Sequence, residues 1–279
     1  MKELLRMAIV TLTSDMGLAD HYVASVKGAI LALAPQATIV DISHDVRAFD
    51  INHAAYLLKS TWQNFPMGTI HVIGVRPELT MKSPHLVVHY MSHYFIAADN
   101  GIFSLLFDTM PEDIFEINLK NQSDWTFPMR SVFGTAAAHL AKGGPVEFLG
   151  RRISEVRKVH GNQVSIEENL IKGVVVHFDR FENVHTNIPQ TLFDTHRANR
   201  SFTITLRLGT KAISKISADF TEVISGDHLA MWGSNGMMII AVNHGASGHG
   251  GGAKSLLGAK INDVVRVEFY GNQNSKNDF

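Results

Sequence analysis

Segments typical of strands and helices alternate along the first half of the chain. Residues 9–17 form a short apolar run that leads into an acidic, glycine-containing turn, which predicts a buried strand ending at Asp15. Apolar side chains then recur at helical spacing, at Val23, Val26, Ile30 and Leu33. Pro35 ends this predicted helix.

More strands and helices follow in the same alternating order. Strands are predicted over 38–42, 69–75, 86–90 and 94–97, and a helix of small residues over 134–142. Asp50 or Asn52 can cap another helix that extends to about Trp62. The motif 99–101 is a turn signal at a strand end. This alternation predicts the α/β class, with a mostly parallel sheet.

The pattern changes after about residue 165. Short strands are predicted over 171–178, 202–208, 228–232, 237–242 and 264–269, with no strong helix between them. This half therefore reads as a small C-terminal β-barrel. A polar stretch over 157–169 separates the halves, so we expect an α/β domain over 1–160 and a barrel domain over 170–279. The polar tail 272–278 is expected to fray.

Composition narrows the possible functions. The chain has 279 residues, is 45% hydrophobic and carries a formal net charge of −1, which argues against a nucleic-acid or anionic-membrane surface. It has no cysteine and no apolar run long enough to span a membrane, so we expect a cytoplasmic protein. Fifteen histidines lack the spacing of a zinc site, so no metal is expected.

Asp15 has two open interpretations. It can be the N-cap of a helix that begins near Leu18, where a carboxylate accepts backbone N–H groups. Alternatively it binds a ligand, because ligands of open α/β sheets lie at the carboxyl ends of the strands. A carboxylate there can accept hydrogen bonds from both hydroxyls of a sugar diol.

Three polar segments stand out in the second half. Residues 179–188 bring together Asp179, Asn183 and Asn187, which is either a polar loop or a site for amines and amides. Ser234-Asn235-Gly236 is an ordinary hairpin turn whose amides can also hold a carboxylate. The glycine-rich run 245–252 lacks the Lys-Ser/Thr ending of a phosphate-binding loop and is interpreted as a flexible loop.

The order of these motifs resembles one family. The motifs that carry the resemblance are Thr13-Ser14-Asp15-Met16-Gly17 with Asp20 and Tyr22, Lys27-Gly28, Asp41-Ile42-Ser43-His44, Asp99-Asn100-Gly101, the segment from Asp179 to Ile188, and Ser234 with Gly236. Together they resemble the S-adenosylmethionine hydroxide adenosyltransferases, relatives of the fluorinase and chlorinase. The resemblance spans about residues 9–269.

The resemblance implies an N-terminal α/β domain, a C-terminal β-barrel and a homotrimer. S-adenosylmethionine, as substrate or ligand and with no further cofactor, would lie between the N-terminal domain of one subunit and the C-terminal domain of the next. By position, Asp15 would hold the ribose hydroxyls, Phe49 would pack on the nucleoside, Asn183 and Phe181 would contact adenine, Asp179 would pair with the methionine ammonium, and Ser234 and Asn235 would hold its carboxylate.

The implied reaction is displacement at the ribose C5′ with methionine as the leaving group, for which the protein mainly desolvates and aligns the nucleophile. Hydroxide-transferring members activate water with an Asp-Arg-His triad. This chain departs from that pattern, because Arg76 stands at the acid, Ser83 near the arginine and Pro128 at the histidine. Ser131 also replaces the aspartate of the last motif.

The substitutions remove the expected base. A guanidinium stays protonated at neutral pH, so Arg76 cannot accept a proton from water. Arg76 is therefore either a surface or structural residue paired with Glu78 or another acid, or a group that places an anion beside C5′. The nearby residues His71, His85, Asp99 and Glu78 are alternative bases.

Three functions are compatible with this pattern. The chain is an S-adenosylmethionine-dependent enzyme that reacts slowly or with an altered nucleophile, a binder of S-adenosylmethionine or adenosine without catalysis, or a structural trimer with a vacant pocket. Asp15, Asp179 and Asn183 argue against the third.

Overall fold

The computed structural model describes residues 8–119, 126–206 and 212–271. The chain divides into two compact units, residues 1–161 (unit 1) and 162–279 (unit 2), and the division falls inside the polar stretch 157–169. The predicted tail 272–278 and the last two residues of the predicted strand 202–208 lie outside the described residues.

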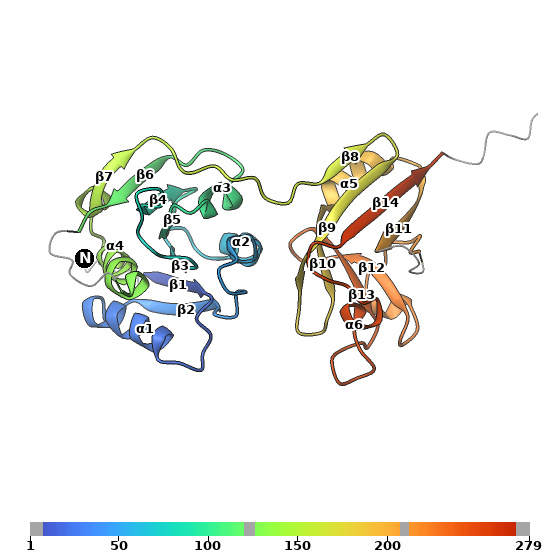
Figure 1. Cartoon of the computed structure of the whole chain (residues 1–279), viewed down its shortest axis with the longest axis horizontal. Coiled ribbons are helices and arrows are strands. Elements are labelled where there is room, and N and C mark those ends of the chain that lie inside the picture. The colour runs from blue at the N-terminus through green and yellow to red at the C-terminus, as the bar shows by residue number, and fades with distance from the viewer. Residues whose placement is uncertain (1–7, 120–125, 207–211, 272–279) are drawn as a thin grey trace, which may run out of the picture. The chain divides into compact units, whose positions relative to one another are not determined.

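Unit 1 is built on a seven-stranded sheet of order β2-β1-β3-β5-β4-β6-β7 (Figure 1). Its strands are β1 (Ile9–Ser14), β2 (Thr38–Ser43), β3 (Ile70–Gly74), β4 (His85–Tyr90), β5 (His93–Ala98), β6 (Asp113–Ile117) and β7 (Gly150–Ile153). β2, β1, β3 and β5 run parallel, whereas β4, β6 and β7 pair antiparallel. The predicted α/β class is confirmed, and the antiparallel strands at one side are an addition to it.

Helices cover both faces of this sheet. The regular helices are α1 (Tyr22–Leu33), α2 (Ile51–Lys59), α3 (Ile102–Leu106) and α4 (Gly134–Ala141), with 3₁₀ turns at Trp62–Asn64 and Val146–Leu149 and a π turn at Met129–Phe133. Val10 and Leu12 of β1 pack with α1 and α4, as do Ile70 and Val72 of β3. Ile73 of β3 packs with α2 and α3 on the other face. Because β1 is covered on both faces, all its residues from Val10 to Ser14 are buried, including the polar Thr11 and Thr13.

A buried pair of imidazoles lies beside the 3₁₀ turn Trp62–Asn64. Nδ1 of His71 is 2.7 Å from the hydroxyl of Thr11, and Nε2 of His71 is 3.2 Å from Nδ1 of His93. Trp62 and Phe65 pack edge-on against the His71 ring. Burial, together with repulsion from His93, lowers the pKa of His71 from 6.5 to about 3.

This pKa predicts a loss of stability in mild acid. Below pH 6.5 the unfolded chain binds a proton at His71 that the folded chain excludes, so the contribution is complete above pH 6.5 and is lost as the pH falls toward 3. At pH 5 the loss is about 2 kcal/mol. Urea unfolding of wild type and His71→Gln at pH 7 and pH 5 checks this, and equal pH dependence in the two proteins would contradict it.

Unit 2 is a nearly closed antiparallel barrel. Its strands are β8 (Ser165–Glu167), β9 (Leu170–Phe178), β10 (Val184–Pro189), β11 (Ser201–Leu206), β12 (His228–Trp232), β13 (Met237–Val242) and β14 (Val264–Tyr270). They follow the order β11-β14-β9-β10-β13-β12, and β8 pairs with β9. Ile213 bridges to β11 and Ile216 to β12, so one short segment touches both edges of the sheet. Buried and less buried residues alternate along β10 and β11, as expected for strands with one core face.

One prediction for unit 2 is wrong, because a helix does interrupt the strands. Helix α5 (Gln190–Arg197) follows β10 directly, and shorter helical turns occupy Phe220–Glu222 and Ala253–Leu256 (α6). Helix α5 has only two apolar residues, Leu192 and Phe193, and Phe193 is the buried one. The buried ring of Phe193 contacts Phe202, Trp232 and Phe269.

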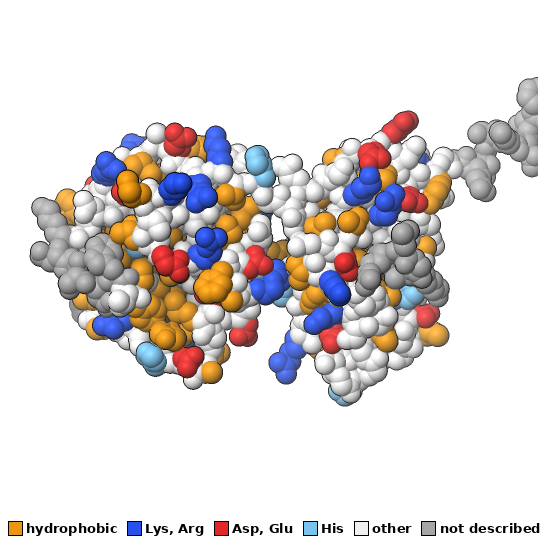
Figure 2. Space-filling model, viewed as in Figure 1, with side chains coloured by type: hydrophobic (Ala, Val, Ile, Leu, Met, Phe, Trp, Pro, Cys, Tyr) orange, Lys and Arg blue, Asp and Glu red, His pale blue; other side chains and the backbone are white. Residues whose placement is uncertain are grey.

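On the face shown in Figure 2, basic and acidic side chains are interspersed over each unit, and neither sign of charge dominates a large area. Within 8–119, 126–206 and 212–271, every helix is too short or too polar to cross a bilayer.

Candidate functional site

The carboxyl edge of the unit 1 sheet has the geometry of a ligand site. Strand β1 lies between β2 and β3, so the chain passes to one side of β1 and then to the other. In open α/β sheets ligands bind at such a reversal, outside the carboxyl ends of the strands. Ser14 is in register with Gly74, which places the following residues, Asp15 and Val75, next to each other at this edge.

Asp15 does not cap a helix. The N-cap position of α1 is His21, and the half-buried carboxylate of Asp15 instead accepts a hydrogen bond from the backbone N–H of Phe49 at 2.8 Å. Phe49 adopts a left-handed backbone conformation with φ 63°, and its ring is 68% exposed. The structure therefore brings these two predicted ligand residues together. Strained backbone of this kind costs about 1 kcal/mol or more and is concentrated at functional sites.

Arg76 also has a left-handed backbone, with φ 49°. The side-chain amide of Asn100 holds it there, donating to the carbonyls of Val75 at 2.9 Å and Arg76 at 3.1 Å. The Arg76 side chain is exposed and forms no ion pair with Glu78 or any other acid in the described part of the chain. Arg76 is therefore a surface residue, as one of the two interpretations has it, but without the expected ion pair among the described residues.

At the other substituted positions, Ser83, Pro128 and Ser131 take part in local turns of the backbone. Ser83 lies in a tight turn in which its backbone pairs with Thr80 in both directions. Pro128 is buried and precedes the π turn Met129–Phe133. The hydroxyl of Ser131 donates to the carbonyl of Phe127.

Of the four alternative bases, His71, His85 and Asp99 are buried and already hydrogen-bonded within the protein. His71 lies in the core at the middle of β3, and Nε2 of His85 is 2.8 Å from the Pro77 carbonyl. Both carboxylate oxygens of Asp99 accept the backbone N–H of Arg157, at 3.0 and 2.9 Å, while burial raises the pKa of this carboxyl. Glu78 is exposed. Among the described residues, no group of three or more His, Asp or Glu side chains is arranged to hold a metal.

In unit 2, Asp179 organises the turn between β9 and β10. Its Oδ1 accepts the N–H groups of Phe181 and Asn183, both at 2.9 Å, and its Oδ2 accepts from the Asn183 side chain at 2.8 Å. His185 Nε2 lies 3.2 Å from Oδ2. Burial opposes ionisation of Asp179, but the hydrogen bonds from His185 and Asn183 outweigh it and lower the pKa of the carboxyl. The Phe181 ring is 60% exposed beside the buried Asn183.

The glycine-rich run supports this turn. The carboxylate of Glu182 accepts from the N–H of Gly252 at 2.9 Å and from the Ser255 hydroxyl at 2.5 Å. A Cβ on Gly252 would lie 2.3 Å from the carbonyl oxygen of Phe181, so only glycine permits this approach. The sequence pattern did not reveal this contact, because the two segments are far apart along the chain.

Ser234 and Asn235 lie at the opposite end of β10 from Asp179 and Asn183. They form the turn between β12 and β13, where the side chain of Asn235 accepts the N–H of Met237. Met237 pairs with Pro189 at the end of β10, whereas Val184 at its start follows Asn183. A ligand that contacts both turns must span the length of β10, about 15 Å.

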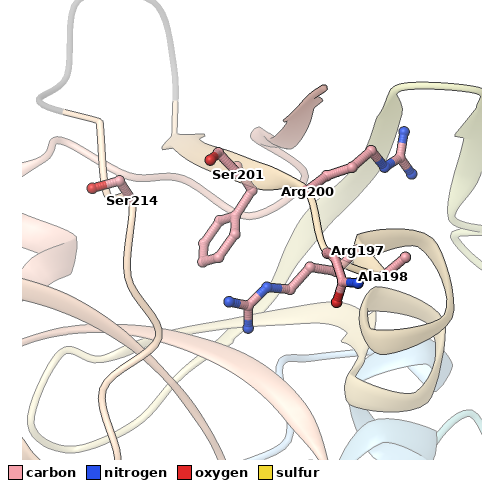
Figure 3. Close-up of a pocket in the computed structure, with 7 residues that line it drawn as sticks. Arg197, Ala198, Arg200, Ser201 and Ser214 are labelled. Atoms are coloured by element: carbon pink, nitrogen blue, oxygen red, sulfur yellow. The ribbon is translucent and has the colours of Figure 1, made fainter. Parts of the chain in front are cut away.

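A separate cavity of about 460 Å³ lies beside α5, β11 and Ser214 (Figure 3). The Arg197 guanidinium lies over the Phe202 ring, and Arg200 points away from that ring and donates to Asn169 and two carbonyls. None of the predicted ligand residues lines this cavity.

The fold and the site define a two-domain protein with an α/β switch-point site and a polar turn on a C-terminal barrel. Comparison with family models identifies the class. The SAM hydroxide adenosyltransferase N-terminal domain matches residues 10–150, and its C-terminal domain matches residues 173–266. The chain belongs to this family.

Comparison with individual proteins points to the same family. The (R)-S-adenosyl-L-methionine hydrolase of Thermus thermophilus is 30% identical, over 91% of this chain and 97% of that protein. The fluorinase of Nocardia brasiliensis is 26% identical, over 85% of this chain and 91% of that protein. A crystal structure of an uncharacterized conserved protein from Thermotoga maritima matches with a TM-score of 0.83 and 27% identity, covering 94% of this chain and 99% of that one.

Proposed function

We propose that the chain binds S-adenosylmethionine and acts at the ribose C5′ with release of methionine. Slow attack by water forms adenosine, and attack by another nucleophile forms a 5′-substituted 5′-deoxyadenosine. The observation that carries the proposal is the Asp15 carboxylate at the switch point. Its Oδ2 accepts from Phe49, and its Oδ1 has no hydrogen bond within the described residues, so acceptor capacity remains for ribose hydroxyls.

The remaining contacts follow the family resemblance. The exposed rings of Phe49 and Phe181 would pack on the nucleoside, and Asn183 would bond to adenine. Asp179 would face the methionine ammonium, for which its lowered pKa keeps it ionised. The resemblance gives the methionine carboxylate to Ser234 and Asn235, but the ammonium and carboxylate of methionine are on one carbon. One methionine therefore cannot reach both this turn and Asp179 across the length of β10, and we keep Asp179 in the proposal. The family resemblance also leads us to propose a homotrimer.

The proposed step is a displacement. With water as nucleophile, its oxygen forms a bond to C5′, the C5′–S bond breaks with both electrons going to the methionine sulfur, and the water proton passes to solvent. The proposed role of Arg76 is to hold an anion at this position, since a guanidinium beside a sulfonium is unfavourable unless an anion lies between them. An anionic nucleophile also needs no base.

A second candidate is a binder without catalysis, which the replacement of the triad by Arg76, Ser83 and Pro128 favours. One experiment separates the two. Purified protein is incubated with S-adenosylmethionine, with and without added halide, and adenosine, halogenated nucleoside and methionine are followed by chromatography while calorimetry measures binding. Product supports the enzyme, binding without product supports the binder, and the absence of binding overturns both.

A further inference from the structure

A line of polar side chains runs from the surface of unit 1 to the residue before Asp15. Lys27 Nζ lies 2.5 Å from Oδ2 of Asp41, and Oδ1 of Asp41 lies 3.1 Å from Nε2 of His44. Nδ1 of His44 is 2.7 Å from the hydroxyl of Ser14. Ser14 and His44 are 0% and 4% exposed. Asp41 and Lys27 are each about one-third exposed, so the line begins in solvent and ends in the core.

The same residues hold the backbone around Asp15. The carbonyl of His44 accepts the N–H of Gly17 at 2.8 Å, and the carbonyl of Ser14 accepts the N–H of Val46 at 3.3 Å. The Ser14 hydroxyl also accepts the N–H of Met16 at 3.4 Å. The backbone on both sides of Asp15 is therefore held by contacts of Ser14 and His44.

Proton positions along this line follow from the donors and acceptors. Oδ1 of Asp41 lies 3.1 Å from Nε2 of His44 but without the alignment of a hydrogen bond, so the contact is electrostatic, and a proton on Nε2 is attracted by this carboxylate. In the neutral ring Nδ1 is then an acceptor, and the Ser14 hydroxyl must donate to it. This leaves the Ser14 oxygen lone pairs free to accept the N–H of Met16.

We propose that His44 is a positioning residue that sets the Asp15 turn for ligand binding. It does not contact the ligand. Its ring fixes the Ser14 hydroxyl and thereby the position of its own backbone carbonyl, which accepts the Gly17 amide. These contacts set the direction of the Asp15 carboxylate and of its hydrogen bond to Phe49. The part of this inference that concerns ligand affinity rests on the proposed function, whereas the part that concerns the turn does not.

Matched variants test the inference. His44→Leu removes both ring contacts, whereas His44→Asn keeps an acceptor near Ser14. His93→Leu is the control, because His93 is also 4% exposed. It lies at the start of β5, so it is at the amino ends of the parallel strands and not at the carboxyl ends, where Asp15 lies. Backbone hydrogen exchange is followed by mass spectrometry in peptides that contain Gly17 and Phe49, and calorimetry measures the affinity for S-adenosylmethionine and adenosine.

The expected result has two parts. His44→Leu accelerates exchange at the 15–17 and 46–49 segments and weakens affinity about tenfold, since a buried hydrogen-bond partner is lost. His44→Asn restores most of both. His93→Leu lowers the melting temperature. Its affinity stays close to that of wild type, and exchange at the 15–17 and 46–49 segments, measured relative to the rest of unit 1, also stays close to wild type.

Equal behaviour of His44→Leu and His93→Leu overturns the inference, as does unchanged exchange in His44→Leu. If wild type binds neither ligand, the proposed function fails, and the exchange measurements alone decide whether His44 sets the turn.

Discussion

Replacing Asp15 by alanine is expected to weaken S-adenosylmethionine binding about 100-fold. The carboxylate is placed to accept ribose hydroxyls, and hydrogen bonds to a charged group contribute about 1.5–3 kcal/mol, which corresponds to one to two powers of ten in affinity. The substitution also leaves the Phe49 N–H without its acceptor, so the strained backbone at φ 63° relaxes and the exposed ring moves. Titration calorimetry of wild type and variant measures the change.

Asp45→Ala is the control for this prediction. Asp45 is exposed and lies in the segment between β2 and α2, as Phe49 does, so it tests the general effect of removing a carboxylate near the site. Its affinity should match that of wild type. A melting curve checks that Asp15→Ala remains folded. Full affinity in Asp15→Ala, or an equal loss in Asp45→Ala, would show that the carboxylate does not anchor the ligand.

Local patterns predicted much of unit 1 because burial and periodicity are local signals. The strand predicted within 9–17 and the spacing of Val23, Val26 and Ile30 correspond to β1 and α1. Asp50 is confirmed as the N-cap of α2, and its carboxylate accepts the N–H of His53. Helix α5 was missed because its helical state depends on Phe193 reaching aromatic rings from distant strands, and no window of the sequence contains those partners.

The candidate site shows the same limit. The polar turn after β1 pointed to Asp15, but only the register of β1 with β3 shows that Asp15 and Val75 are neighbours. The contact between Asp15 and Phe49 joins residues 34 positions apart. Asn100 was recognised only as part of a turn signal, whereas in the fold its amide holds the backbone of Arg76. Long-range hydrogen bonds of this kind have no signature in one sequence.

Rebuilding the triad is expected to accelerate hydrolysis of S-adenosylmethionine by about 10²–10⁴-fold. The triple variant Arg76→Asp, Ser83→Arg, Pro128→His restores the acid, the arginine and the imidazole, and a positioned general base contributes a factor of this size. Aspartate is among the residues that tolerate the left-handed backbone of position 76, at φ 49°. Position 128 has φ −59° and ψ −34°, which histidine also adopts.

The rate of adenosine release, measured by chromatography at saturating S-adenosylmethionine, checks this expectation. Arg76→Asn is the matched control, because it removes the cation and suits the same backbone but supplies no carboxylate base. If the triple variant binds the ligand and is no faster than Arg76→Asn, these three positions do not converge on C5′. If Arg76→Asn alone reaches the triple variant's rate, the guanidinium hinders attack by water, and the chemistry differs from that of a hydrolase chiefly through this one charge.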